Sequence, residues 1–202
     1  MKVLDLDNFI DEKIKIVPIS DKDFNKIPDD LYRYHPKNKK ELLSIIKKRI
    51  KNEGNECDLN DIDTSKITDM SYLFAKYDSN RNPIKDNANN FNGDISQWDV
   101  SNVKDMGWMF WGMKHFNGNI SKWDVSNVKN MQGTFSGSKS FNQDLSMWDV
   151  SNAIVITYMF NGASSFNQDI SRWNVSNVRN SYGIFKGCPI ENQPEKQPEL
   201  KK

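Results

Sequence analysis

The sequence has few of the residues that enzymes use for acid–base or nucleophilic catalysis. It contains two histidines, His35 and His115, and two cysteines, Cys57 and Cys188. It has no GxSxG nucleophile motif, no glycine-rich phosphate loop, and no His and Cys cluster at metal-ligand spacing. Because no group of residues suggests catalysis, a metal or a cofactor, we expect a non-enzymatic protein that acts by binding.

The sequence also lacks a long apolar segment and a strong excess of one charge. No stretch approaches the roughly 20 apolar residues of a membrane-spanning helix, and the first residues lack the apolar region of a secretory signal. The 28 lysines and arginines nearly balance 27 acidic residues, so the overall charge does not require a nucleic-acid or membrane partner. As written, the sequence predicts a cytoplasmic protein without a membrane span.

A 25-residue unit dominates the remainder of the chain. Four consecutive copies begin at Phe91, Phe116, Phe141 and Phe166, and each contains the pattern F-N, then W-x-V-S-N from the eighth residue. A diverged earlier copy over 58–74 aligns with 94–110 at an offset of 36 residues, which is one repeat plus 11 inserted residues. Units this short cannot bury their apolar residues alone, so we expect five of them to stack over residues 55–190, with an inserted loop at 75–90.

The spacing of apolar residues suggests the shape of one unit. From Ile95 they recur mostly at steps of three, with one step of two between Trp98 and Val100. Steps of two favour an extended strand and steps of three favour tight turns. The sequence therefore predicts an α/β-type repeat solenoid, a leucine-rich-repeat-like stack of about five coils with short parallel strands. Four tryptophans should form its buried internal column: Trp98, Trp123, Trp148 and Trp173.

A helix is predicted over residues 38–54, where it would cover the open end of the first coil. Asn38 is placed to cap the helix, Glu41 stands where a capping-box acid belongs, and Gly54 would end it. Its apolar stripe comprises Leu42, Ile45, Ile46 and Ile50. The basic residues of this segment either face water or bind nucleic acid: Lys39, Lys40, Lys47, Lys48, Arg49 and Lys51.

The remaining segments are less informative. Residues 1–37 form an extension of unknown structure, in which Ser20 to Lys26 is compatible with the start of a short helix. Residues 191–202 are predicted to be a disordered tail. Cys57 and Cys188 fall in the first and last units, too far apart for a disulfide, and unpaired thiols fit a reducing compartment.

The repeat resembles a known family. Ile95-x-x-Trp98-x-Val100 is similar to the LxxLxL strand of leucine-rich repeats, and residues 141–152, FNQDLSMWDVSN, resemble the BspA-like repeats of bacterial, mycoplasma-type surface proteins. Residues 91–190 follow that pattern except at 153–155, and Glu191 stands where a phenylalanine would begin a sixth copy. The resemblance implies surface adhesion or host contact, since many such proteins are exported. An intracellular inhibitor or adaptor that acts by occlusion remains the alternative.

Positions that differ between copies are the best candidates for recognition, because invariant positions maintain the stack. One outward column varies in chemistry: Gln97, Lys122, Met147 and Arg172. A neighbouring column is acidic, with Asn174 in the last copy: Asp99, Asp124 and Asp149. Each acid precedes x-Ser-Asn and suits an Asx-turn, although cation binding or partner contact is also open. The asparagine column at 92, 117, 142 and 167 is expected to satisfy the backbone of neighbouring coils.

The second copy has an unusual aromatic patch, for which we name Trp108, Trp111 and Met113 as candidate binding residues. Trp111 occupies a column that is otherwise small or polar, so it is either an interface residue or packs beneath the 75–90 loop. The ring of Trp108 has a candidate hollow at Gly133 in the next copy. The sequence thus predicts a binding module with a protein partner, and carbohydrate or nucleic acid as alternatives.

Overall fold

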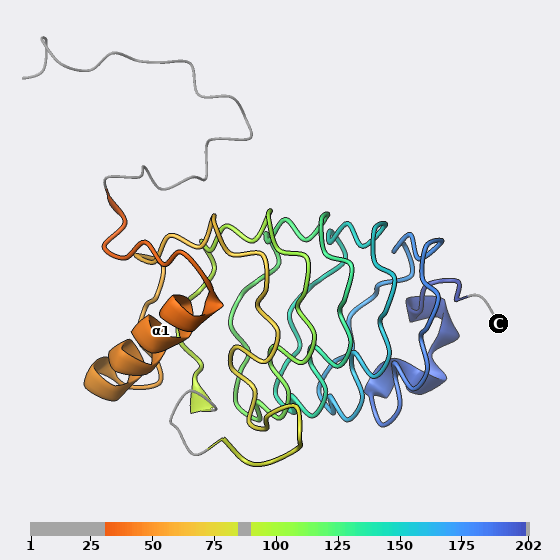
Figure 1. The fold of residues 1–202 in the computed structure, drawn as a ribbon. Helices are drawn as coiled ribbons and strands as arrows, with labels where there is room; N and C mark the ends of the chain where they lie inside the picture. The colour runs from red at the N-terminus through yellow and green to blue at the C-terminus, as the bar shows by residue number, and fades with distance from the viewer. Residues whose placement is uncertain (1–30, 85–89, 201–202) are drawn as a thin grey trace, which may run out of the picture.

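The structure is a computed structural model that describes residues 31–84 and 90–200. The five repeat copies wind as successive coils that lie side by side, with the helix α1 against the first coil and the short C-terminal helices against the last (Figure 1). The segment Ser20 to Lys26 lies outside the described residues, as does part of the predicted 75–90 loop.

The predicted α/β solenoid with short parallel strands is wrong. Within residues 31–84 and 90–200 there is a single α-helix, α1 (Lys39–Glu53), together with the 3₁₀ helices η4 (Pro189–Asn192) and η5 (Pro194–Lys196), and no β-strand. Neighbouring copies meet at isolated parallel bridges, which lie in one line: Asp69 with Asp105, Asp105 with Asn130, Asn130 with Val155, and Val155 with Asn180. The coils therefore stack without forming a sheet.

Tight turns explain why no strand forms around the tryptophans. The backbone N–H of Trp98 donates to Ile95 O at 3.2 Å, and that of Val103 donates to Val100 O at 2.9 Å. One turn ends at Trp98 and the next begins at Val100. The extended segment between them is only three residues long, 98–100, which is too short for a ladder of backbone hydrogen bonds. Trp98 and Val100 are nonetheless both buried. The two-residue spacing therefore predicted correctly which side chains point inward, but the strand that it predicted does not form.

On the opposite side of each coil, backbone bonds within and between copies alternate. The N–H groups of Met70 and Tyr72 donate to Asp105 O and Gly107 O of the next copy, at 2.9 and 3.0 Å. The backbone N–H of Leu73 instead donates to Met70 O of the same copy, at 3.2 Å, and so closes a turn. Because every second backbone N–H closes a turn within its own copy, this side of the coil also has no extended strand. The remaining N–H groups bond to the next copy at regular intervals.

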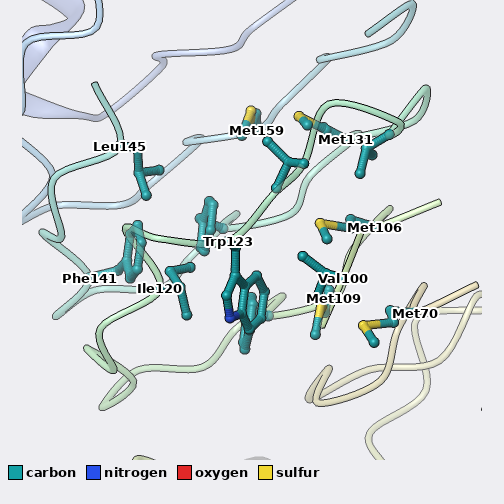
Figure 2. Packing of buried hydrophobic residues seen from close by; sticks show 14 of the residues in the cluster. Met70, Val100, Met106, Met109, Ile120, Trp123, Met131, Phe141, Leu145 and Met159 are labelled. Atoms are coloured by element: carbon teal, nitrogen blue, oxygen red, sulfur yellow. The ribbon is translucent and has the colours of Figure 1, made fainter. Parts of the chain in front are cut away.

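The prediction that the four tryptophans are buried is confirmed, because each is at most 4% exposed. Each indole N–H donates to a backbone carbonyl of the preceding copy, at 2.9 to 3.1 Å: Trp98 to Leu59, Trp123 to Ile95, Trp148 to Ile120, and Trp173 to Leu145. The rings of Trp98 and Trp123 are nearly parallel, with centroids 6.3 Å apart. Figure 2 shows Trp123 among buried side chains of other copies, such as Val100 and Leu145.

Two columns of phenylalanine fill the rest of the core. One runs through Phe91, Phe116, Phe141 and Phe166, and the other through Phe74, Phe110, Phe135, Phe160 and Phe185. The columns also contact each other, since the rings of Phe135 and Phe141 are stacked with centroids 4.0 Å apart. Phe135 therefore touches rings in the copies on both sides of its own, which makes burial of these rings a shared property of the stack.

Polar side chains complete the joints between copies. The side-chain oxygen of Asn92 accepts from the backbone N–H of Asn117 at 2.8 Å, and the same bond joins Asn117 to Asn142 and Asn142 to Asn167. This confirms the expected role of the asparagine column. A second asparagine column donates its side-chain N–H to the preceding copy, as Asn102 does to Ser65 O at 2.9 Å.

The acidic column forms turns inside each copy. Asp99 Oδ1 accepts from the backbone N–H of Ser101 at 3.0 Å and from its hydroxyl at 2.6 Å, and Asp124 does the same with Ser126. The bonds from the hydroxyl and backbone N–H of Ser151 lower the pKa of Asp149, against a smaller opposing effect of burial. Because Asn174 accepts the same bond from Ser176 N–H, the turn needs an oxygen acceptor and not a charge.

Helix α1 covers the first coil, and its ends follow the sequence signals. Asn38 Oδ1 accepts from Glu41 N–H at 3.0 Å, and Gly54 adopts a positive φ of 91° after the last turn. The residues of α1 that are buried in the core are Leu42, Ile46 and Ile50. Arg49 is 8% exposed and binds Asp61 and Glu53, so one of the predicted basic surface residues is structural.

The C-terminal segment packs on the last copy. Residues 191–200, for which the sequence predicts disorder, carry part of η4 and all of η5. Ile190 is fully buried, Lys196 O accepts from Ile170 N–H at 3.0 Å, and the side chain of Gln193 donates to Asn167 Oδ1 at 3.1 Å. These bonds continue the asparagine column beyond the fifth copy, so the tail takes the place of a sixth.

Replacing Phe135 with alanine should lower the free energy of unfolding by about 3–5 kcal/mol, because it removes a fully buried ring that packs on rings of both neighbouring copies. Urea denaturation followed by circular dichroism measures the change. Met147→Ala is the control, since Met147 is 85% exposed and its loss should cost less than about 0.5 kcal/mol. Equal effects of the two substitutions would contradict the assignment of the core.

The Asx-turn predicts a difference between two substitutions of Asp149. Asp149→Ala removes the acceptor for Ser151 N–H and should cost about 0.5–1.5 kcal/mol of unfolding free energy, whereas Asp149→Asn should be nearly neutral because Asn174 performs the same task. Thermal denaturation of both variants at pH 7 measures the difference in stability. A large loss with asparagine would show that the charge itself is required.

Stability should also fall in acid. The backbone N–H and hydroxyl of Ser146 lower the pKa of Asp144, as the Ser151 bonds do for Asp149. A lowered pKa in the folded state stabilises the protein above the unfolded value of about 3.9, and this contribution is lost as pH falls through the folded value. We expect the melting temperature to drop between about pH 4 and pH 2, and to drop less in Asp144→Asn/Asp149→Asn. An identical pH profile for that double variant would refute the assignment.

Candidate functional site

The variable column that the sequence selects for recognition lies at the surface. Its four members, Gln97, Lys122, Met147 and Arg172, are all exposed. Neither of the two grooves described below includes any of them. They remain candidates for contact with a partner over a flat surface.

The acidic column is less available than the sequence alone suggests. One carboxylate oxygen of Asp99, Asp124 and Asp149 is taken up by the turn serine of the same copy. Asp124 and Asp149 are exposed, so their other carboxylate oxygen can still meet solvent or a partner, whereas Asp99 is partly buried. Among residues 31–84 and 90–200, no group of three or more His, Cys, Asp or Glu is placed to hold a metal ion.

The aromatic patch divides into a buried and a partly exposed portion. Met113 is fully buried in the core, so it cannot contact a partner, and its selection as a binding residue was wrong. Trp108 and Trp111 are each partly exposed and line a groove of about 490 Å³. The other lining residues come from the first, third and fourth copies: Tyr72, Ser79, Arg81, Ser136, Tyr158 and Asn161.

The two tryptophans belong to a longer row of aromatic rings, which we call the aromatic strip: Tyr72, Tyr77, Trp108, Trp111, Tyr158 and Tyr182. The centroids of Trp108 and Trp111 are 4.8 Å apart, and Trp108 also neighbours Tyr72 and Tyr158 at 6.5 and 6.4 Å. Tyr158 in turn contacts Tyr182, which is 71% exposed, at 5.5 Å. The strip therefore runs from the first copy to the fifth.

An unusual backbone conformation builds the strip. Tyr72, Trp108 and Tyr158 have φ values of 56° to 60°, and the equivalent residues of the third and fifth copies, Gly133 and Gly183, have 59° and 63°. Glycine adopts this conformation readily, whereas aromatic residues do so at a cost of about 1–3 kcal/mol each. Three aromatic residues at a position that suits glycine indicate that their side chains are retained for another reason.

The two glycines provide space for the rings of the preceding copies. A side chain at Gly133 would lie 2.2 Å from Trp108 Cε3, and one at Gly183 would lie 2.9 Å from the ring of Tyr158. The predicted hollow at Gly133 is thus confirmed. Trp108 and Tyr158 lie over these hollows, which fixes the direction in which both rings face the groove.

Trp111 combines the two interpretations that its sequence position allows. Its ring lies 4.9 Å from that of Tyr77, which belongs to the inserted segment, and its backbone oxygen accepts from Lys76 N–H at 2.8 Å. It also lines the groove beside Trp108. Trp111 therefore helps to hold the inserted segment and presents part of its ring to the groove.

The hydrogen bonding of the indoles separates the two classes of tryptophan. All four core tryptophans donate N–H to a carbonyl of the preceding copy, whereas the indole N–H groups of Trp108 and Trp111 have no acceptor within the described residues. Arg81, which lines the same groove, makes no side-chain hydrogen bond or ion pair within the described part of the chain. The groove thus combines ring surface with N–H donors that remain accessible to solvent or a ligand.

A second groove of about 360 Å³ lies on the line of bridges between the third and fifth copies. It is lined by Lys129, Asn152, Ile154, Ser176, Asn177, Val178 and Arg179. Asn152 and Asn177 already donate to Ser126 O and Ser151 O of the preceding copies. This groove carries two basic side chains and no aromatic ring, so it has less of the character of a protein interface.

Several residues of the strip and its groove were missed from the sequence: Tyr72, Tyr77, Tyr158, Tyr182, Ser79 and Arg81. A signal for three of the strip residues was present in the column 72, 108, 133, 158 and 183, which has aromatic residues in three copies and glycine in two. Glycine in two of the five copies suggests a backbone conformation that favours glycine. The aromatic residues in the same column could therefore have been recognised as unusual. Tyr77, Ser79 and Arg81 lie in the insertion, where no sister copy offers a comparison.

The histidines and cysteines show no catalytic arrangement in the described part of the chain. Cys188 is buried, its thiol donates to Phe166 O at 3.2 Å, and burial raises its pKa to about 11. Burial also raises the pKa of the Cys57 thiol. His115 is exposed, and His35 Nδ1 lies 3.3 Å from the Asp63 carboxylate at the edge of the first coil. Both thiols are thus poor nucleophiles at neutral pH.

Comparison with known proteins identifies a family without an assigned activity. Residues 40–87 and 79–197 match a family described as Mycoplasma protein of unknown function, DUF285. No curated protein and no solved structure shows a significant match. Within the part of the chain that the structure describes, no helix is both long enough and apolar enough to cross a bilayer. Because the match covers α1, the repeats and most of the C-terminal segment, the chain belongs to this family of mycoplasma repeat proteins.

Proposed function

We propose that the protein is a non-catalytic binding module that presents the aromatic strip to a protein partner. The observation that carries the proposal is the strained row Tyr72, Trp108 and Tyr158, whose partly exposed rings line a groove together with Trp111. Aromatic residues are enriched at the centres of protein interfaces, where they bury large rings at low entropic cost. Glycine would suit the backbone better at these positions, so retention of the rings supports a binding role.

The setting in which the module acts has two candidates. Membership of a mycoplasma repeat family, together with the resemblance of residues 141–152 to BspA-like leucine-rich repeats, supports a bacterial surface protein that contacts a host. An intracellular inhibitor or adaptor that acts by occlusion would use the same strip. The two settings differ in where the native protein is found, which fractionation of the source cells determines.

The basic residues of α1 give less support to nucleic-acid binding than the sequence suggests. Lys39 binds Asp69 and the hydroxyl of Ser71, and Arg49 is buried against Asp61 and Glu53 while its guanidinium lies over the ring of Tyr34. Two of the six basic side chains therefore stabilise the end of the stack. Four exposed lysines remain, at 40, 47, 48 and 51, which is an ordinary number for a solvated helix.

Replacing Trp111 with serine should abolish capture of the partner. The substitution removes ring surface from the centre of the groove and should weaken binding at least tenfold, as expected of a buried aromatic at an interface. It should also lower the unfolding free energy by about 1–2 kcal/mol, because the ring packs on Tyr77 and Trp108. Affinity capture from the source cells, quantified by mass spectrometry, measures binding.

Met147→Ser is the matched control for this experiment. Met147 is 85% exposed on another face, so its loss tests whether any large apolar side chain at the surface promotes capture. We expect proteins that are retained by the wild type and Met147→Ser but not by Trp111→Ser. If Met147→Ser loses the same proteins and Trp111→Ser retains them, recognition belongs to the variable column and not to the strip.

A further inference from the structure

We infer that the groove of the aromatic strip binds a proline-rich segment of the partner in the polyproline II conformation. The inference rests on the proposed function, because it names the kind of protein segment that the strip would take. Three properties of the groove favour this ligand: its backbone is already hydrogen-bonded, its unpaired polar groups include strong donors, and its rings form a continuous surface.

The first property excludes a bound β-strand along the strip. Trp108 N–H donates to Gln132 O at 2.7 Å, Phe110 N–H to Thr134 O at 2.9 Å, and Tyr158 N–H to Tyr182 O at 3.0 Å. The main chain beneath the strip therefore has no row of free donors onto which an extended peptide could pair. A ligand must be held by side chains, through ring contacts and side-chain hydrogen bonds.

The second property concerns the polar groups of the groove. The indole N–H groups of Trp108 and Trp111 only donate, the Arg81 guanidinium offers five N–H donors, and none of the three makes a side-chain hydrogen bond within the described residues. The lining residues include no carboxylate. Such a groove fits a ligand that presents acceptors.

A polyproline II segment has this character. The conformation makes no internal hydrogen bonds, so its carbonyl groups all point outward, and proline has no backbone N–H. Its pyrrolidine rings also pack against aromatic side chains, as in other grooves that recognise proline-rich sequences. The ligand therefore matches the groove in both ring surface and hydrogen-bonding polarity, and it loses little entropy because it is already extended.

The length of the groove sets the length of the segment. Its lining runs from Tyr72 in the first copy to Asn161 in the fourth, three coil-to-coil steps of about 4.8 Å, or about 14 Å in all. At about 3.1 Å per residue this length holds four or five residues of polyproline II. A decapeptide is therefore long enough to fill the groove in more than one register.

A carbohydrate chain is a weaker fit. Its C–H faces would stack on the rings, but each sugar hydroxyl donates as well as accepts and needs an acceptor on the protein. The side chains that could accept are Ser79, Ser136, Asn161 and the tyrosine hydroxyls, all of them neutral single oxygens, and the lining has no carboxylate to accept from two sugar hydroxyls at once. Oligosaccharide binding is thus an outcome to be tested against the proline-rich ligand.

The test uses the full chain and a fluorescein-labelled decaproline peptide, with binding followed by fluorescence anisotropy. The wild type and Met147→Ser should bind with affinities within about twofold of each other, and a labelled glycine–serine decapeptide should not bind. Trp111→Ser should weaken decaproline binding at least about tenfold. Trp111→Phe, which keeps a ring but removes the N–H donor, should weaken binding about two- to tenfold, because it deletes one hydrogen bond.

Thermal denaturation of each variant shows whether it is folded, and Trp111→Phe keeps the test valid if Trp111→Ser is not. Three results overturn the inference: the wild type does not bind decaproline, it binds the glycine–serine peptide equally well, or Trp111→Phe binds decaproline as tightly as the wild type. Binding of labelled cellohexaose in place of decaproline also overturns it. If decaproline fails while capture of a cellular partner still depends on Trp111, the proline-rich ligand is wrong and the proposed function stands.

Discussion

The stack depends on one contact that repeats in every copy, the buried indole whose N–H donates to a carbonyl of the preceding coil. The ring supplies apolar burial, and the hydrogen bond satisfies the buried indole N–H with a carbonyl oxygen that already closes a turn in its own copy. Because Trp123 bonds to Ile95 O, each copy is incomplete until its neighbour is present. The same dependence holds for the phenylalanine columns, so the stability of one coil is largely a property of the pair.

Joining the coils through side chains leaves the backbone free to turn. A sheet would hold successive residues in extended geometry, whereas here every second N–H closes a turn and each copy from the second to the fifth has two positions with a positive φ. The second of these positions is always glycine, whereas the first has glycine at Gly133 and Gly183 and an aromatic ring at Trp108 and Tyr158, as at Tyr72 in the first copy. The strip and its groove are therefore consequences of a strandless coil, since no regular strand would place residues in this conformation.

The sequence predicted the stack, the buried tryptophans, the asparagine column and α1, because each rests on a local or strictly repeating signal. It predicted strands wrongly because inward residues two apart, Trp98 and Val100, arise in a strand and equally between two turns. It placed Met113 in the patch because this residue lies in the same aromatic-rich segment as Trp108 and Trp111, although its side chain is fully buried in the core. The polar and aromatic contributions of Tyr77 and Arg81 were missed because the inserted segment has no counterpart in other copies.

The two classes of tryptophan show how a repeat protein can separate structure from recognition with one residue type. A core indole is fixed by a carbonyl of the neighbouring coil, and its position in the repeat is occupied by tryptophan in all four regular copies. Trp108 and Trp111 occur in one copy, lie partly exposed, and have donors that no described carbonyl satisfies. The buried side-chain polar atoms that lack a partner in the described part of the chain are Asn55 Oδ1 and Thr157 Oγ1, so water can reach the indole N–H groups of Trp108 and Trp111. These accessible donors and the exposed ring area beside them support the proposal that this face contacts another molecule.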